Sequence, residues 1–338
     1  MQMESKVQRN NGLDVLKCIC AFFIVSIHAP FPGEFGKYFI SIARIAVPIF
    51  FMITGFYYKD VINKNKENNQ IIKIIKLIVL SNILYFILNI IINFNNGTLV
   101  SFFTSIFSYK TILKLLVFND SPMWSHLWYL NSLLYVLIIY KYLPINKLNK
   151  KQLIAISFIL LFIDIIFGKY SLLILHKEIN YIFLRNFIFV GFPYFTIGSL
   201  IREQIEEKKQ KKSMIYPYLI VVFTITTLLE RFLLEQNGVN ATRDHYISTT
   251  LLSITVFLYF YCTKNNFKIL NKIGYKYSTL IYIIHPIVLL IISKAIVLAN
   301  ASKIEYCLPF IVFILSIIIS HIYIYIKNNI SKKIIKKD

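Results

Sequence analysis

The first apolar stretch of the chain carries titratable side chains at spacings that suit chemistry. The stretch reads "LDVLKCICAFFIVSIHAPFPGEF" and contains Asp14, Lys17 and His28. His28 follows Lys17 by eleven positions, and eleven helical steps of about 100° end about 20° past three full turns, so both side chains share one helix face. Asp14 precedes Lys17 by three positions and is close enough to pair with it. One face is therefore predicted to carry a charge pair and an imidazole.

This polar stripe suits a proton transfer at one end and the binding of a charged group at the other. A neutral imidazole can take a proton from a hydroxyl nucleophile, which makes His28 a candidate general base. The rise from Lys17 to His28 is about 16.5 Å, roughly half the thickness of a bilayer's hydrocarbon core. A histidine that only hydrogen-bonds between helices explains this stretch equally well.

Other polar residues lie within apolar stretches, where they are costly and usually face a cavity or a partner. Arg44, in "RIAVPIFF", could hold a carbonyl oxygen or an acceptor anion, and Arg185 is a second candidate. Either arginine could instead pair with Glu230 or with lipid phosphate. The remaining polar residues of these stretches are Asp164, Arg231, His285, Lys294 and His321, of which Asp164, Lys294 and His321 lie near stretch ends and could snorkel.

His285 is followed by Pro286, which interrupts the hydrogen bonding of a helix. The boundaries of its apolar stretch place His285 closer to the cytoplasmic half of the membrane. His285 is therefore not expected to act as a second base near the outer face.

The chain's two tryptophans, Trp124 and Trp128, lie together in "MWSHLWYL". They suit the aromatic belt at the outer membrane interface. Equally, Trp128 could stack on a sugar ring while His126 supplies a polar contact.

The elements that position these residues follow from the composition. Of 338 residues, 57% are hydrophobic, including 29 Phe and 23 Tyr, which is too apolar for an ordinary soluble domain. About 20 helical residues cross the hydrocarbon core, and strand-like alternation is absent. We predict a single domain over 1–338, an all-α polytopic bundle of about ten spans: 13–30, 38–58, 71–93, 126–143, 152–168, 185–201, 214–234, 246–262, 278–298 and 306–326.

Orientation follows from the cations, because positively charged loops stay cytoplasmic. With both termini inside, the inside segments hold 25 Lys and Arg and the outside segments hold 7. The net charge of +21 thus lies in short loops beside spans, which fits anionic lipid better than nucleic acid. No cleavable signal precedes the first span, and the four cysteines lack metal-ligand spacing, so no metal is predicted.

The longest segment outside the predicted spans is 94–125, whose apolar positions and two lysines suit a helix in the outer interface. Such a helix could roof a site that opens outward, or it could be a passive connector.

Several motifs, in order, carry a resemblance to a known family. "GLDVLKCICAFFIVSIHAPFP", "ARIAVPIFFMITGFYYK", "HLWYL", "RNFIFVGFPYFTIGSLI" and "YSTLIYIIHPIV" together resemble the membrane acyltransferase family three, whose members O-acylate glycans and other acceptors. The resemblance runs from about residue 9 to the last predicted span. This sequence departs from the family at Lys17, where arginine is usual, and lysine lacks the planar fork that binds phosphate in two places.

The resemblance implies a function and roles for the residues above. An acyl group, often acetyl, would pass from cytoplasmic acyl-CoA, a co-substrate and not a bound cofactor, to an acceptor outside the cell membrane. His28 and Asp14 would be catalytic, and Lys17 and His285 would contact the acyl-CoA. The residues expected to bind the extracytoplasmic glycan or related envelope acceptor are Arg44, His126, Trp128 and Arg185.

Two alternatives remain open. "RIAVPIFFMITGFYY" also resembles the membrane half of the serine racemases of vancomycin resistance, which implies uptake of an amino acid such as serine by a transporter with the same polar cavity. A third interpretation is a non-catalytic subunit of a complex that exports or synthesises polysaccharide.

Overall fold

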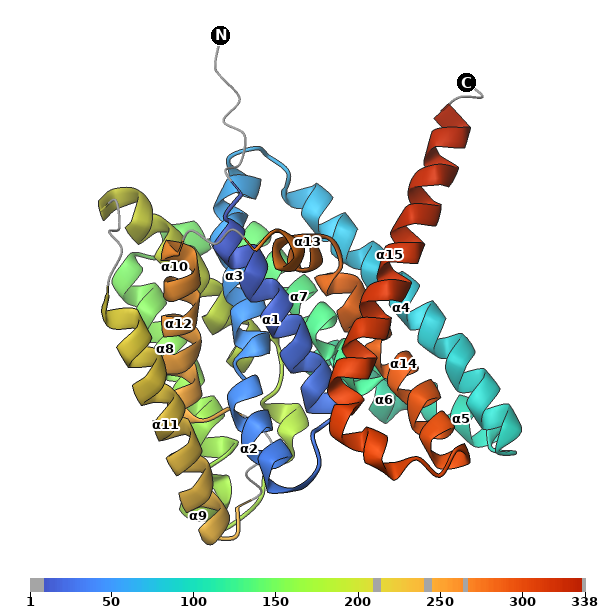
Figure 1. The fold of residues 1–338 in the computed structure, drawn as a ribbon. Coiled ribbons are helices and arrows are strands. Elements are labelled where there is room, and N and C mark those ends of the chain that lie inside the picture. The colour runs from blue at the N-terminus through green and yellow to red at the C-terminus, as the bar shows by residue number, and fades with distance from the viewer. Residues whose placement is uncertain (1–8, 209–213, 240–244, 264–266, 336–338) are drawn as a thin grey trace. The chain divides into compact units, whose positions relative to one another are not determined.

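The regular structure is helical throughout the part of the chain that is described. The structure, a computed structural model, describes residues 9–208, 214–239, 245–263 and 267–335, and the side chains of Asn146, Ser302 and 331–335 are not described. These residues form helices α1 to α15 with short 3₁₀ segments and one π-helix (Figure 1). The predicted all-α class is confirmed. Some of the lysines and arginines used to predict the orientation lie outside the described residues, namely those at 6, 209, 211, 212, 243, 264, 336 and 337.

Six helical segments are long and apolar enough, by length and composition, to cross a membrane. They are Asn11–His28, Gly33–Ile62, Glu67–Asn95, Ile215–Gln236, Ser278–Leu298 and Lys303–Ile330. Each coincides with one of the ten predicted spans. The other four predicted spans fall on α7 (Trp128–Tyr142), α8 (Lys150–Phe167), α10 (Phe192–Lys208) and α12 (Ile247–Cys262). The total of ten and the cytoplasmic termini stay predictions.

The chain divides into two compact units. The first comprises residues up to Val47, 211–233 and Ser248 onward, and the second comprises Pro48–Gln210 with Leu234–Ile247.

The first unit is built around α1 (Asn11–His28), which packs against α2 (Gly33–Ala43), α13 (Lys268–Lys276), α14 (Ser278–Leu298) and α15 (Leu308–Ile335) (Figure 1). Asn10 caps α1, since its side chain accepts a hydrogen bond from the Leu13 N–H. Gly274 lets α13 lie directly on α1, because a Cβ there would come within 1.8 Å of the Asp14 carbonyl oxygen. Most of α11 (Ile215–Gln236) and α12 also belong to this unit.

The second unit holds α4 (Glu67–Asn95), α7, α8 and α10. It also holds α3 (Ala46–Ile62), apart from the first two residues of that helix. α4 packs on α7, and α8 packs on α10. Glycine again brings helices together: a Cβ on Gly55 would lie 2.0 Å from the Phe195 carbonyl oxygen, and one on Gly198 would lie 2.0 Å from that of Met52. α3 and α10 therefore meet backbone to backbone at two levels.

An irregular segment precedes α10. The predicted span 185–201 begins instead with a bend at Arg185 and a π-helix over Phe187–Gly191, and α10 starts only at Phe192. Asn186 opens the π-helix, and its side-chain oxygen accepts from the N–H groups of Ile188 and Phe189. A π-helix within a helical run often marks a functional position.

The segment 94–125 is not one continuous helix. It contains α5 (Leu99–Ile106) and α6 (Tyr109–Phe118), which are bent by 50° relative to each other. Asn119 ends α6 in the left-handed conformation, with φ of 52°. Whether this pair covers a site stays a prediction.

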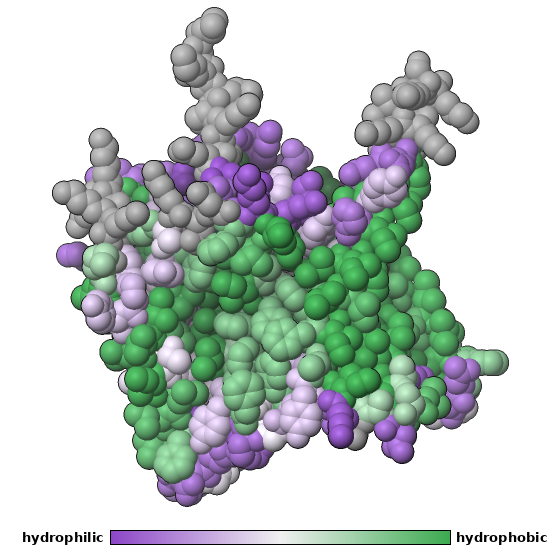
Figure 2. Space-filling view, viewed as in Figure 1, coloured by the Kyte–Doolittle hydropathy of each residue, from purple (hydrophilic) through white to green (hydrophobic). Residues whose placement is uncertain are grey.

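Large apolar side chains are exposed along the helices, as expected of surfaces that face lipid. On α15 these include Phe310, Ile314, Ile318 and Ile322, each about half exposed. Figure 2 shows this helix as mostly apolar surface. With six candidate spans, these surfaces identify the chain as a membrane protein.

Candidate functional site

The start of α1 carries a buried carboxylate between two cations. Asp14 is 1% exposed, and its carboxylate accepts from the Lys17 ammonium at 3.3 Å. The predicted Asp14–Lys17 pair is therefore confirmed. Arg9 forms a second ion pair with the other carboxylate oxygen. The three side chains together carry one net positive charge.

Arg9 is the residue here that the sequence analysis missed, because it was counted only as an inside loop charge. Its guanidinium lies 3.9 Å from the centre of the Tyr275 ring and donates to the Asn271 carbonyl oxygen at 3.3 Å, and both partners are on α13. The residue precedes the helix cap, so helical spacing gave no signal for it. A planar guanidinium is thus present at this end of the stripe, although at position 9 and not at 17.

Two histidines meet in the first unit. The ring of His28, the last residue of α1, lies 5.1 Å from the ring of His285 on α14, with their planes inclined by 47°. The expectation that His285 lies toward the cytoplasmic half, and so is not beside the acceptor's base, does not agree with this contact. Sequence-based span boundaries carry errors of several residues, and they take no account of how α14 crosses α1.

The surroundings of the two rings differ. His28 is exposed, whereas His285 is fully buried. The Nδ1 atom of His285 lies 3.0 Å from the Ile281 carbonyl oxygen, which can only accept, so Nδ1 carries the proton in this contact. Nε2 is then the basic nitrogen of a neutral His285. The pair therefore combines an accessible imidazole with a buried one of defined tautomer.

The first unit also holds two further arginines. Arg44 lies between α2 and α3, is half-buried, and its N–H donates to the Ile40 carbonyl oxygen at 3.1 Å. Arg231, for which no role is predicted, is fully buried on α11. Its guanidinium lies 4.8 Å from the centre of the Tyr38 ring and 3.4 Å from the Ser41 hydroxyl, both on α2.

The second unit brings together Trp128 and Arg185, two of the predicted acceptor residues. The Arg185 guanidinium lies 5.4 Å from the Trp128 ring and 4.4 Å from the Tyr181 ring. His126 is 3% exposed, and its ring meets that of Tyr85 edge-on at 5.2 Å. The Arg185 cation therefore makes cation–π contacts with both rings; Arg185 and Tyr181 are half-buried, whereas Trp128 is buried.

Asn119 fixes this arrangement and was not singled out from the sequence. Its buried side chain donates to the Trp128 carbonyl oxygen at 3.3 Å and accepts from the Phe187 N–H at 2.9 Å. Its own carbonyl oxygen accepts from Asn131 at 3.3 Å. One side chain thus joins the start of α7 to the π-helix that follows Arg185.

Two other polar residues have side-chain partners, Asp164 in a buried position and His321 in an exposed one. Asp164, 4% exposed, lies 3.3 Å from the Nδ1 atom of His245. The Nδ1 atom of His321 lies 2.9 Å from the Tyr277 hydroxyl.

The predicted site residues thus fall into two groups, and their roles stay predictions. The first unit holds Asp14, Lys17, His28, Arg44 and His285, and the second holds His126, Trp128 and Arg185.

The fold and these groups define an all-helical membrane protein with buried polar chemistry, and comparison with known proteins supplies the family. The acyltransferase domain of the family-three type matches residues 10–326. The chain belongs to this family.

The curated relatives are proteins of Enterococcus faecalis. One, named an amino-acid racemase, is 27% identical over 350 residues, which covers 95% of this chain and 47% of the relative. A second amino-acid racemase is 28% identical over 250 residues, covering 69% of this chain and 34% of the relative. The chain therefore spans about half the length of the first relative and a third of the second. No solved structure matches it.

Proposed function

We propose that the chain is an O-acyltransferase of the cell membrane. It would move an acyl group, with acetyl as the expected case, from cytoplasmic acyl-CoA to a hydroxyl of a cell-surface carbohydrate or related envelope acceptor. The observation that carries the proposal is the meeting of His28 and His285 inside a chain of the acyltransferase family. A paired imidazole is a suitable base for a hydroxyl nucleophile.

The reaction balances with His28 as the base. Its ring takes the proton from the acceptor hydroxyl as the oxygen attacks the thioester carbonyl, and the carbon–sulfur bond then breaks. The departing thiolate takes the proton back from the imidazolium, which gives free CoA and restores the base. His285 would hold the His28 ring in place. Its Nδ1 proton is directed to the Ile281 carbonyl oxygen, so its basic Nε2 atom is the one that can interact with the His28 ring.

The charged end of α1 would bind the anionic part of acyl-CoA. Arg9 and Lys17 carry two positive charges against the single negative charge of Asp14. A guanidinium suits phosphate because it donates two parallel hydrogen bonds. The helix places this group about 16.5 Å from His28, measured as the rise from Lys17. A long pantetheine arm could bridge that distance. Asp14 would hold both cations in place.

Within the second unit, the acceptor would be bound by the residues around Arg185. The Trp128 and Tyr181 rings flank the Arg185 guanidinium, and His126 lies two residues before Trp128. Aromatic faces stack on sugar rings, and a guanidinium can hold an acidic substituent of the acceptor.

Sidedness and chemistry can be tested in one experiment. Inverted and right-side-out vesicles are incubated with labelled acetyl-CoA, and label is followed into surface glycan. We expect labelling only when acetyl-CoA has access to the cytoplasmic face, and loss of labelling in His28→Ala. Full activity in His28→Ala, at equal protein in the membrane, would remove the base assignment.

Transport of a small solute such as serine is the second candidate, because the match to an amino-acid racemase covers 95% of the chain. Buried charges mark solute paths as well as active sites. Reconstituted vesicles that accumulate labelled serine without acyl-CoA would favour transport over acyl transfer.

A further inference from the structure

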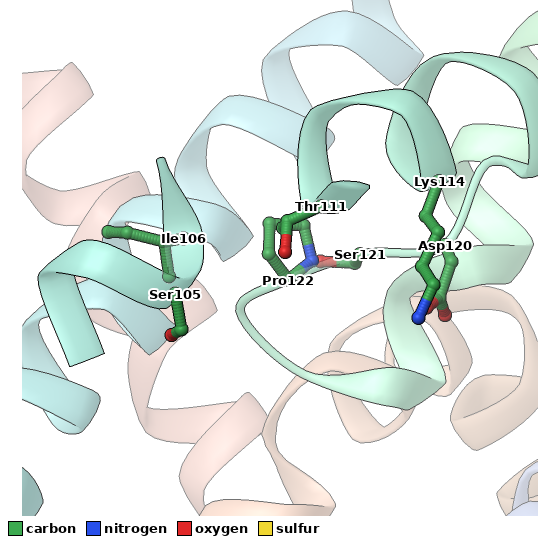
Figure 3. Close-up of a pocket in the computed structure, with 7 residues that line it drawn as sticks. All are labelled: Ser105, Ile106, Thr111, Lys114, Asp120, Ser121 and Pro122. Carbon is green, nitrogen blue, oxygen red and sulfur yellow. The ribbon is translucent and has the colours of Figure 1, made fainter. Parts of the chain in front are cut away.

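A polar pocket lies between α5, α6 and the loop that follows, in the second unit. Its volume is about 260 Å³, and it is lined by Ser105, Ile106, Thr111, Lys114, Asp120, Ser121 and Pro122. Figure 3 shows the Lys114 and Asp120 side chains extending side by side, with Ser105 and Ile106 across from them on α5. None of the site residues described above lines it.

Local structure builds the charged side of this pocket. The left-handed conformation of Asn119 reverses the chain after α6, and the Asp120 N–H then donates to the Lys114 carbonyl oxygen at 3.2 Å. This return brings the two charged side chains together. The loop is held further by the Ser121 hydroxyl, which bonds to Asn82 and accepts from the Met123 N–H, both at 3.3 Å.

The two charges stay available to a ligand. No ion pair joins Asp120 to a cation among the described residues, although Arg185 and Lys114 lie within electrostatic range. Burial raises the pKa of Asp120 more than these two cations lower it. The carboxylate is therefore less well compensated than one in water, and a cation placed beside it would stabilise its charged form.

The hydroxyl groups of the pocket restrict the ligand further. Ser105 donates to the Phe102 carbonyl oxygen and Ser121 donates to Asn82, so both present lone pairs to the pocket. Apart from Lys114 and the Thr111 hydroxyl, the polar side chains of the lining therefore act as acceptors. A ligand must bring a donor for Asp120 and these oxygens, and an acidic group for Lys114. No aromatic side chain lines the pocket to stack on a sugar ring.

We infer that this pocket binds a small zwitterionic group, with its ammonium on Asp120 and its acidic group on Lys114. Both a free amino acid and an ethanolamine phosphate headgroup of a lipid carry this pair of charges. Phe107, which follows the lining residue Ile106, and Leu116 on α6 are exposed apolar side chains that would suit a lipid. The inference does not depend on acyl transfer, because it concerns residues with no part in that proposal.

The test uses the purified full-length protein in detergent and measures binding of soluble probes by calorimetry. L-serine and O-phosphoethanolamine carry both charges, L-lactate carries only the acidic group, ethanolamine carries only the ammonium, and glycerol is neutral. We expect saturable binding of serine, of phosphoethanolamine or of both, and at least tenfold weaker binding of the other three. Phosphoethanolamine alone would identify a lipid headgroup, and serine alone a free amino acid.

Variants locate the site. Asp120→Asn and Lys114→Met should each weaken binding of the zwitterion at least tenfold, whereas Lys110→Met, an exposed lysine on the same helix, should leave it unchanged. Absence of binding to the unmodified protein would overturn the inference, and so would equal binding of lactate, ethanolamine or glycerol. Unchanged binding in both pocket variants would also overturn it. Acyl transfer, measured separately with His28→Ala, would be unaffected by any of these results.

Discussion

The two units hold their polar groups in different ways. In the first, Asp14, His28 and His285 lie on the continuous helices α1 and α14, where most backbone groups bond within the helix, although Pro286 in α14 has no N–H to donate. In the second, Trp128 and Arg185 lie at the junction of a short 3₁₀ turn with α7 and in a bend before a π-helix. There, side chains such as Asn119 supply the backbone's missing partners.

This difference teaches where each group is vulnerable. Side chains on packed helices keep their positions when a neighbouring polar side chain is removed, because helix packing fixes the backbone. Irregular segments depend on a few polar side chains, and removal of one leaves buried backbone groups unsatisfied. Substitutions in the first unit should therefore lower activity by removing reacting groups. Substitutions in the second unit should lower stability by removing the side chains that bond to irregular backbone.

The largest effect is expected at the histidine of the first unit. His28→Ala should lower kcat for acyl transfer roughly 100- to 10,000-fold, the range for loss of a general base. The measurement is transfer of labelled acetyl at saturating substrates. His176→Asn is the control, since His176 is an exposed histidine of the second unit in the left-handed region, which asparagine tolerates. A comparable loss in the control would break the comparison.

The second-largest effect concerns stability and compares a buried polar side chain of each unit, Asn119 and Ser26. Asn119→Ala should destabilise the second unit by about 3 kcal/mol, because it leaves buried donors and acceptors without partners. Ser26→Ala in the first unit should cost less than about 1 kcal/mol, since the Ser26 hydroxyl donates to the Phe22 carbonyl oxygen of its own helix, α1. Both tryptophans belong to the second unit, so their emission reports its unfolding. Equal losses in the two variants would contradict this expectation.

Two charge-conserving substitutions sharpen the division of roles. Arg185→Lys removes the planar contact with Trp128 and Tyr181 and should raise KM for the acceptor several-fold, in line with about 1 kcal/mol for a cation–π contact. Arg9→Lys should raise KM for acyl-CoA and leave that for the acceptor unchanged. Initial rates with each substrate varied in turn separate the two, and a crossed result would reverse the assignment.

The smallest effect is expected in the surface ion pairs of the second unit. The pKa of Glu206 is lowered, chiefly by the hydrogen bond from Lys59. Such a group stabilises the fold above its unfolded pKa, and that contribution disappears as pH falls through the folded pKa. Lys59→Met should therefore cost under about 1 kcal/mol at pH 7 and almost nothing in acid. Thermal unfolding in detergent at both pH values measures this, and an equal cost at each would point to lost packing.

Contacts that depend on spacing within one helix could be predicted from the sequence. Contacts between segments far apart in the sequence could not. Asp14 and Lys17 are three residues apart in a helix, so their pairing follows from helical geometry. The contact of His28 with His285 depends on where α14 crosses α1, which no local pattern encodes. The Trp128 and Arg185 contact depends on Asn119 and a π-helix, and neither has a periodic signature.

Composition predicted the class and most of the long helices, because hydrocarbon thickness sets their length. Irregular backbone at Arg185 escaped it, since apolar windows do not distinguish an α-helix from a π-helix followed by an α-helix.

The glycine contacts between α3 and α10 have a consequence for motion in the second unit. Gly55 faces the Phe195 carbonyl oxygen and Gly198 faces that of Met52, so each helix places its backbone in a notch of the other. Sliding one helix along its neighbour by a single residue would replace each glycine with a side chain that the notch cannot hold. The two helices should therefore move together as one rigid body in any conformational change.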